Sequence, residues 1–249
     1  MIISKLIGRL FAPALNFDMN VQVVIPAYNE AKTIFEIIRK LKDQVSQIIT
    51  VDDGSTDDTG ELAKQAGAKV LTHFLNRGQG AALQTGISFA LANGAEIIVT
   101  FDADGQHNPD EIDQVIKPLL LGEVDVVLGS RFLESRIKNQ ELRIKNVPLM
   151  RFVVLKLAAW FTRLYTGLKV TDAHNGFRAF SAKAASLIEI KQDGMAHASE
   201  IIEQIKKQGL KFKEVPVEIN YTNYSLEKGQ KLSNSWRIVW DLIIKRISK

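Results

Sequence analysis

The sequence predicts an α/β fold in which helices cover both faces of a mostly parallel β-sheet. The first observation behind this prediction is order, because apolar strand-like runs alternate with helix-like segments along the chain. The second is the position of the polar and glycine-rich motifs, which directly follow the strand-like runs. In such sheets the ligand crevice lies beyond the carboxyl ends of the strands, so these motifs form the candidate site.

Strand and helix signals alternate from residue 21 onward. A β-branched strand over residues 21–25 is expected to end at Pro26, and apolar residues at helical spacing follow over residues 30–41. Thr56 or Asp57 is expected to cap the next helix, which runs through Ala66. The remaining predicted elements are strands at residues 48–51, 70–71, 96–101 and 124–128 and a small-residue helix at 80–92.

The composition excludes several classes of protein. The 249 residues include no cysteine, so disulfides, thiolate nucleophiles and sulfur-based zinc sites are absent. A net charge of +4 is mild; it permits an anionic partner but does not select nucleic acid over a phospholipid surface. From the sequence as a whole we expect a membrane surface and no nucleic acid as partner. No uncharged apolar run approaches the ~20 residues that span a bilayer. Lys5 and Arg9 interrupt the first apolar segment, which is therefore not expected to be a signal peptide.

Two carboxylates follow the predicted strand at residues 96–101. Asp102 and Asp104 cannot both stay ionised and unpaired in a core, because desolvating each costs several kcal/mol. At the end of the strand they can instead bind a divalent cation, and Gln106 adds another oxygen. Such hard ligands suit Mg²⁺ or Mn²⁺, whose shell is completed by water and substrate phosphates. An ordinary surface turn is the alternative for this motif alone.

The other strand ends carry residues suited to a nucleotide. Tyr28 can stack on a base, and the carboxylates of Asp52 and Asp53 can accept hydrogen bonds from a base or a ribose. A glycine-rich segment at residues 76–80 leads into a helix whose amino-terminal amides favour negative charge. Arg131 can bind a phosphate through two hydrogen bonds. Each of these four motifs alone is also compatible with an ordinary turn. Together with the carboxylate pair described above they make five, and their occurrence in this order favours a nucleotide-binding site.

Together these motifs resemble those of the family-2 inverting glycosyltransferases of the GT-A fold, and most closely the polyprenyl-phosphate (dolichol-phosphate mannose synthase-like) branch. The resemblance covers roughly residues 20–235 and implies a nucleotide-sugar donor and a polyprenyl-phosphate acceptor. The matching runs are Val-Ile-Pro-Ala-Tyr-Asn-Glu at 24–30, Val-Asp-Asp-Gly-Ser-Thr-Asp at 51–57, Asn-Arg-Gly-Gln-Gly-Ala-Ala at 76–82, Asp-Ala-Asp-Gly-Gln-His at 102–107 and Asp-Ala-His-Asn-Gly-Phe-Arg at 172–178. The expected donor-binding residues are Pro26, Tyr28, Glu30, Asp52, Asp53, Arg77, Gly78, Asp102, Ala103 and Asp104, with Asp102, Asp104 and Gln106 on the metal.

The expected chemistry is transfer of a sugar with inversion at its anomeric carbon. A bound cation would stabilise the charge that develops on the leaving diphosphate. Arg131 would share that charge or neutralise an acceptor phosphate. A lipid-phosphate acceptor arrives already anionic, whereas a hydroxyl on a lipid-linked or polysaccharide acceptor needs a general base, for which Asp172 is the candidate. Two other classes stay open: a nucleotidyltransferase, disfavoured because residues 26–30 are not a glycine-rich basic loop, and a non-catalytic nucleotide-sugar-binding module. His107 and His174 are expected to be solvated loop residues, and no supporting constellation surrounds His73 or His197.

Three segments have the pattern of basic amphipathic helices at a membrane surface. They are residues 1–19, 147–165 and 235–249, which carry apolar stripes, lysines and arginines, and in the last two cases tryptophan. We expect an amphipathic segment at 1–19, a glycosyltransferase domain at 20–234 and a carboxyl-terminal amphipathic helix at 235–249. The expected location is cytoplasmic and peripheral to the membrane.

Overall fold

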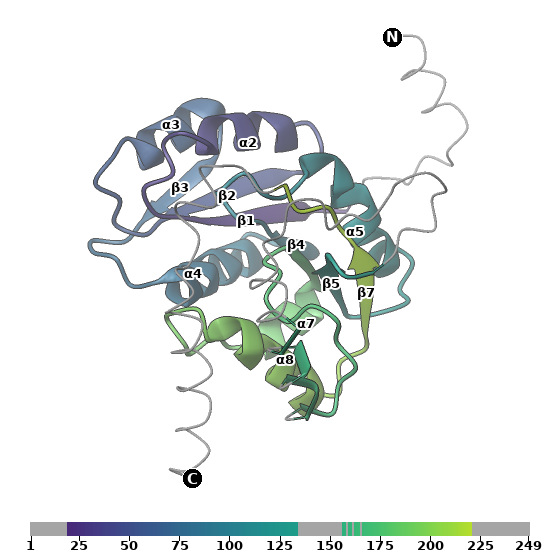
Figure 1. Cartoon of the computed structure of the whole chain (residues 1–249). Helices are drawn as coiled ribbons and strands as arrows, with labels where there is room; N and C mark the ends of the chain where they lie inside the picture. Colours follow the sequence, from purple (N-terminus) through teal and green to yellow (C-terminus); the bar gives the residue numbers. More distant parts are fainter. Residues whose placement is uncertain (1–18, 134–155, 158, 161, 165, 221–249) are drawn as a thin grey trace, which may run out of the picture.

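The computed structural model describes residues 19–133, 156–157, 159–160, 162–164 and 166–220. Strands and helices alternate through most of this part of the chain (Figure 1). The elements are β1 (Val21–Ala27), α2 (Ile34–Leu41), β2 (Gln47–Asp52), α3 (Thr59–Ala66), β3 (Lys69–Thr72), α4 (Gln79–Ala92), β4 (Ile97–Thr100), the 3₁₀ turn η1 (Pro109–Glu111), α5 (Ile112–Leu120), β5 (Val126–Ser130), β6 (Arg178–Ser181), α7 (Ala182–Leu187), α8 (His197–Lys207) and β7 (Phe212–Pro216).

The described strands form one sheet in the order β3-β2-β1-β4-β6-β5-β7. β6 runs antiparallel to both of its neighbours, and the other pairs are parallel. The predicted mostly parallel sheet is therefore confirmed. Because β6 is antiparallel, its amino end lies at the same edge of the sheet as the carboxyl ends of β1, β2, β4 and β5. Loops from both halves of the chain meet at this edge.

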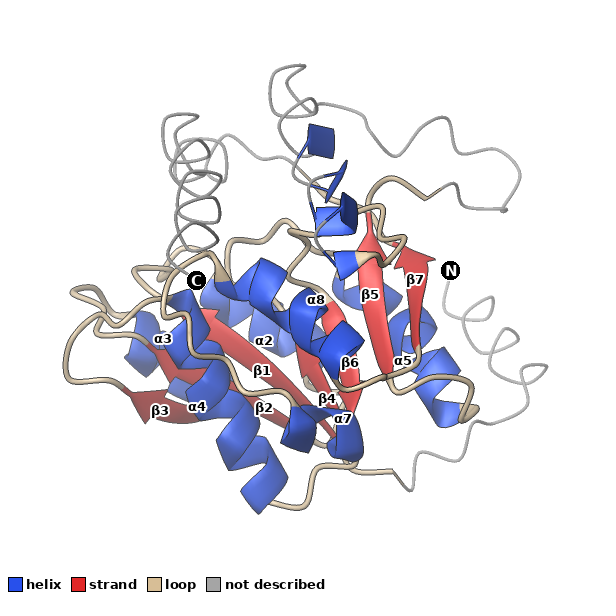
Figure 2. Cartoon of the chain, turned by 90° about the horizontal axis from the view of Figure 1, so that it is seen from below, coloured by secondary structure: helices blue, strands red, loops and turns tan. Residues whose placement is uncertain are grey.

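Helices cover both faces of the sheet, as predicted. Figure 1 shows α2 and α3 on one face and α4, α7 and α8 on the other, and Figure 2 views the second face. Successive side chains of β1 point to opposite faces of the sheet and so belong to two apolar cores. Val23 and Ile25 pack with α2, α3 and α5, whereas Val24 packs with α4, α7 and α8. Both faces of β1 are buried, so its sequence is apolar apart from Gln22.

Most predicted boundaries shift by one or two residues: β5 spans 126–130 rather than 124–128, and α3 follows Asp58, so neither Thr56 nor Asp57 stands at its N-cap. Two further differences have a clear physical reason. β1 does not end at Pro26 but continues to Ala27. Pairing of β1 with β4 stops at Val24, so the missing N–H of Pro26 faces a side where the ladder has already ended. The first helix begins at Ile34 rather than at residue 30, because Glu30 opens a turn in which its carbonyl accepts hydrogen bonds from the N–H groups of Thr33 and Ile34.

The expected amphipathic segment at 147–165 is described only in its second half. The described residues among 156–166 are helical, with Ala159 and Thr162 buried. Leu157, Trp160 and Leu164 point outward and are 56%, 58% and 64% exposed. Residues 1–18 and 221–249, which hold the other two amphipathic predictions, lie outside the described part. Of the helices within it, none has the length and apolarity to cross a bilayer.

Candidate active site

The carboxylate of Asp102 is held in place from three sides just beyond the end of β4. Gln79, the first residue of α4, donates from Nε2 to Asp102 Oδ1 at 2.9 Å, and Nε2 of His107 lies 3.0 Å from Oδ2. On the third side is Gly176, where a Cβ would lie only 2.2 Å from Oδ2. Burial alone would raise the pKa of Asp102, but the His107 hydrogen bond and nearby positive charge hold it below its usual value.

Asp104 is the second carboxylate of the candidate metal site. The backbone N–H of Gln106 donates to Oδ1 at 3.0 Å, and the Gln106 side-chain amide donates to Oδ2 at 2.7 Å. Burial raises the pKa of Asp104 to about 6, and repulsion from Asp102 adds to the rise. Two carboxylates that repel each other at a strand end fit a divalent cation, which would relieve that repulsion. Among the described residues, no group of three or more acidic, histidine or cysteine side chains could hold a metal ion.

Asp52 and Asp53 both organise the polypeptide at the end of β2. Asp52 Oδ1 accepts from Ser55 N at 3.0 Å, and its Oδ2 lies against α3, 2.7 Å from where a Cβ on Gly60 would stand. Asp53 accepts from the N–H groups of Arg77 at 3.0 Å and Gly78 at 2.7 Å. The two side chains are therefore engaged with the protein itself, and their contact with a nucleoside stays a prediction.

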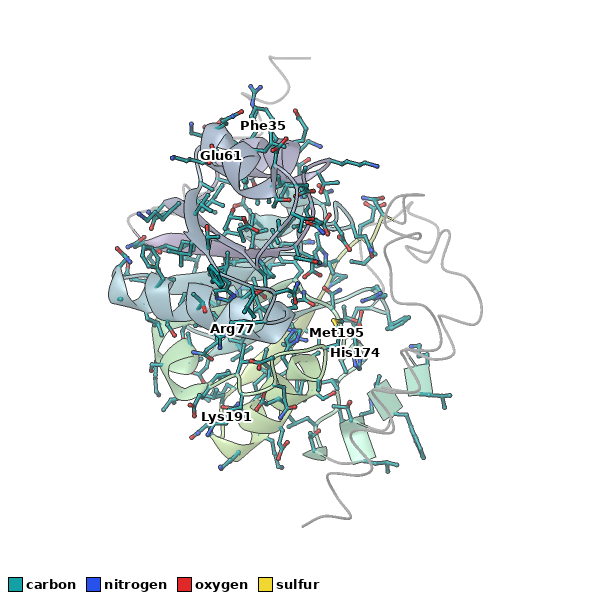
Figure 3. The ribbon with its side chains drawn as sticks, turned by 90° about the vertical axis from the view of Figure 1, so that its left-hand side faces the viewer. Phe35, Glu61, Arg77, His174, Lys191 and Met195 are labelled. Atoms are coloured by element: carbon teal, nitrogen blue, oxygen red, sulfur yellow. The ribbon has the colours of Figure 1, made fainter. Side chains whose placement is uncertain are left out.

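The glycine-rich turn before α4 packs tightly against the loop that precedes α8. Gly78 has a positive φ of 107°, and a Cβ there would lie 2.3 Å from the Asp193 carbonyl oxygen. Gly80 donates its N–H to the same carbonyl at 2.7 Å. Figure 3 labels Arg77 in this turn and Met195 in the facing loop. Glycine is needed at Gly78 for its backbone conformation and at both positions for the close approach of the loop.

Arg131 and Asp172, the two predicted catalytic residues, form a buried ion pair. Arg131 Nε lies 2.6 Å from Asp172 Oδ2, and the Arg131 N–H donates to the same oxygen at 3.2 Å. The side chain of Asp172 is 1% exposed. Glu214 of β7 accepts hydrogen bonds from the N–H groups of Thr171 and Asp172, and burial raises its pKa. β5, β7 and the segment before β6 thus join at this pair.

The remaining predicted donor residues lie at the same edge of the sheet. Pro26 is within β1, and Tyr28, just beyond it, is 43% exposed. The N–H of Glu30 donates to the hydroxyl of Thr59 at 2.7 Å. Ala103 is buried between the two metal candidates. All the predicted donor residues are therefore gathered along one edge, although nucleotide contact by each stays a prediction.

The expectations for the histidines were wrong in most respects. His107 is not solvated but 5% exposed, with its ring packed against Phe101 and Phe177. His174 is half-buried rather than solvated, and burial lowers its pKa to about 4. His197 is also buried, with a pKa lowered to about 4, and His73 contacts Asp53. A solvated loop histidine and a buried, hydrogen-bonded one look alike in sequence, because the groups that contact the buried one come from distant parts of the chain.

Sequence reasoning also missed three residues that shape the surroundings of Asp102. Gln79 and Gly176 stood within recognised motifs, but no local signal gave them a role beside this carboxylate. Arg178 is fully buried; it donates from Nε to the Asn175 carbonyl at 2.9 Å, and burial lowers its pKa to about 10. A charged residue inside a four-residue strand is the one signal that could have marked Arg178 as unusual.

Comparisons with known proteins identify the family of the chain. The model of the family "Glycosyl transferase family 2" matches residues 22–187. A UDP-N-acetylglucosamine–dolichyl-phosphate N-acetylglucosaminyltransferase from Methanococcus voltae is 35% identical, over 93% of this chain and 98% of its own. An undecaprenyl-phosphate mannosyltransferase from Micrococcus luteus is 29% identical over 80% of this chain and 83% of its own. An uncharacterized protein of Methanocaldococcus jannaschii is 43% identical over 90% of this chain and 91% of its own.

A solved structure confirms the fold. Glucosyl-3-phosphoglycerate synthase from Mycobacterium tuberculosis, crystallised with Mn²⁺, UDP-glucose and phosphoglyceric acid, superposes with a TM-score of 0.70. The two sequences are 23% identical, and the match covers 94% of this chain and 81% of the synthase. This likeness confirms the GT-A fold. The chain therefore belongs to glycosyl transferase family 2 and is a nucleotide-sugar glycosyltransferase.

Proposed function

We propose that this enzyme transfers a sugar from a nucleotide-sugar donor to a polyprenyl phosphate at the membrane surface, with a divalent cation and with inversion at the anomeric carbon. The observation that carries the proposal is the pair Asp102 and Asp104 beyond β4, at the edge of the sheet where the buried Arg131–Asp172 ion pair also lies. Relatives named for dolichyl-phosphate and undecaprenyl-phosphate acceptors support the lipid phosphate as acceptor.

Asp102 and Asp104 would hold Mg²⁺ or Mn²⁺, with Gln106 fixing Asp104 and offering a further oxygen. When bound, the cation supplies a Lewis acid for the diphosphate of the donor. An acceptor phosphate oxygen forms a bond to the anomeric carbon, and the bond from that carbon to the nucleoside diphosphate breaks with its electron pair leaving on the β-phosphate. Attack from the face opposite the leaving group inverts the anomeric centre.

The state of Asp172 favours a phosphate over a hydroxyl acceptor. A hydroxyl acceptor needs a group that takes its proton, and Asp172 was the predicted base. Its carboxylate is turned inward onto Arg131, and its Oδ1 lies 3.4 Å from the N–H of His174. An acceptor phosphate is already anionic and needs no such base. A hydroxyl on a lipid-linked or polysaccharide acceptor is the second candidate, and it requires the ion pair to open.

Peripheral attachment to the cytoplasmic face of a membrane is part of the proposal. The outward-facing Leu157, Trp160 and Leu164 form one face of a helix that also carries Lys156 and Arg163. Exposed apolar and aromatic side chains beside basic residues suit the headgroup region of a bilayer. The amphipathic patterns at 1–19 and 235–249 support the same location.

Incubation with membranes and a panel of radiolabelled nucleotide sugars tests the proposal. We expect label from one donor to become extractable into organic solvent as a glycosyl phosphate lipid, only when Mg²⁺ or Mn²⁺ is added. NMR of the product should show the anomeric configuration opposite to that of the donor. Label that stays in water with every donor, or a product with retained configuration, would contradict the proposal.

A further inference from the structure

His73 lies at the centre of a buried hydrogen-bond network between β2 and α4. Its side chain is 9% exposed, and Nδ1 lies 2.6 Å from Asp53 Oδ1. Nε2 lies 3.0 Å from the hydroxyl of Thr85, and that hydroxyl donates its own proton to the carbonyl of Ala81. The Asp53 carboxylate accepts from Nδ1 of His73, and Nε2 faces the Thr85 hydroxyl.

Asp53 connects His73 to the turn before α4. Its carboxylate, whose side chain is 4% exposed, also accepts the N–H groups of Arg77 and Gly78. Removing His73 takes away the side-chain donor of a nearly buried carboxylate and leaves that side of it unpaired. Without His73, Asp53 would turn toward water and release these two N–H groups. The turn depends on them, because Gly78 has a φ of 107° and directly precedes the first residue of α4.

The amino end of α4 connects this turn to the candidate metal site. Gln79, next to Gly78, donates from Nε2 to Oδ1 of Asp102 at 2.9 Å. A continuous path therefore runs from the imidazole of His73 through Asp53 and the Gly78 turn to Asp102. A shift of the turn would move Gln79 and free one side of the carboxylate.

We propose that His73 is a positioning residue for the donor side of the reaction. It fixes Asp53, which fixes the Arg77–Gly78 turn and so sets Gln79 against Asp102. The consequence for donor binding rests on the proposed function, but the action on the turn does not. His73 contributes through Asp53 and touches neither donor nor cation.

Three variants separate positioning from general stability. H73F keeps a planar ring and removes both ring nitrogens. H73N places an amide nitrogen where Nδ1 stands and so keeps the donation to Asp53. L119A is the matched control, because it removes buried volume from α5, on the opposite face of the sheet.

Hydrogen exchange of the Arg77 and Gly78 amides tests the action on the turn without any ligand. Loss of a hydrogen bond of ordinary net strength corresponds to about tenfold faster exchange, which we expect in H73F. H73N should stay close to wild type, and L119A should leave these amides protected although its melting temperature falls. Unchanged exchange in H73F, or an equal increase in L119A, would overturn the proposal.

Titration with UDP and with GDP in the presence of Mn²⁺ tests the consequence for the donor side. We expect H73F to weaken binding of the preferred diphosphate about tenfold, with H73N and L119A near wild type. Wild-type affinity in H73F despite faster exchange would overturn the role in donor binding. If wild type binds neither diphosphate while the exchange result holds, the proposed function fails and the action of His73 on the turn stands.

Discussion

The substitution G176A should displace Asp102 without unfolding the protein. A Cβ built on Gly176 lies 2.2 Å from Oδ2 and 2.4 Å from Oδ1 of Asp102. A carbon–oxygen contact needs about 3.3 Å, so the carboxylate must move by about 1 Å. A carboxylate is the movable end of a side chain, whereas Gly176 is fixed because its carbonyl accepts the hydroxyl proton of Thr100 at 2.7 Å.

A displacement of this size should appear in catalysis more than in stability. Moving Asp102 weakens its hydrogen bonds with Gln79 and His107, and a misplacement of about 1 Å in a catalytic constellation costs about 100-fold in rate. We expect kcat/KM for sugar transfer to fall about 100-fold, with only a small change in melting temperature. The control is G194A, since a Cβ at Gly194 meets nothing within 4 Å. Wild-type kinetics in G176A would refute the claim that Gly176 fixes a catalytic carboxylate.

Three further predictions concern pH, metal and membrane. Burial, and after it the charge of Arg178, lowers the pKa of His197 from 6.5 to about 4 in the folded protein. As the pH falls from 6.5 to 4, His197 is therefore protonated in the unfolded chain but not in the folded protein, which favours unfolding. The melting temperature of wild type should therefore fall across that range. It should fall less in H197N, which keeps a donor for the Gly194 carbonyl, and an equal fall in the two proteins would contradict this. D104N should lower metal-dependent transfer by orders of magnitude, yet melt no lower than wild type at pH 7.5, because an ionised Asp104 is unfavourable above its pKa of about 6. W160S should reduce flotation with anionic vesicles at low salt while leaving UDP or GDP binding unchanged, and undiminished flotation would remove this helix from the membrane contact.

The strands β1, β2 and β4 were predictable because they are buried on both faces. Each is mostly apolar and is followed by a polar or glycine-rich turn. The strands β6 and β7 were missed for physical reasons. β6 has only four residues and begins with the buried Arg178, and β7 is an edge strand in which Lys213 and Glu214 interrupt the apolar pattern. Their pairing comes from tertiary contacts that no local pattern records.

The candidate site likewise contains residues that could be predicted from the sequence and residues that could not. Residues at strand ends, such as Asp102 and Asp104, could be predicted because the carboxyl ends of parallel strands share one edge of the sheet. The partners of these residues could not, since Gly176 reaches Asp102 only through the antiparallel return of β6. His73 likewise meets Asp53 only once β3 has paired with β2. The spacing of motifs indicates which side chains gather, but not which of them hold the others in place.

A comparison of two lipid acceptors, one with a phosphate and one without, most directly tests the central claim that the enzyme transfers a sugar to a lipid phosphate. Purified wild-type protein and D104N are incubated with the preferred nucleotide sugar, Mn²⁺ or Mg²⁺, and either a polyprenyl phosphate or the polyprenol of the same length. Mass spectrometry identifies the lipid product. We predict a polyprenyl-phosphate monosaccharide from wild type alone and no product from the polyprenol. Glycosylation of the polyprenol, or equal product from D104N, would contradict metal-assisted transfer to a lipid phosphate.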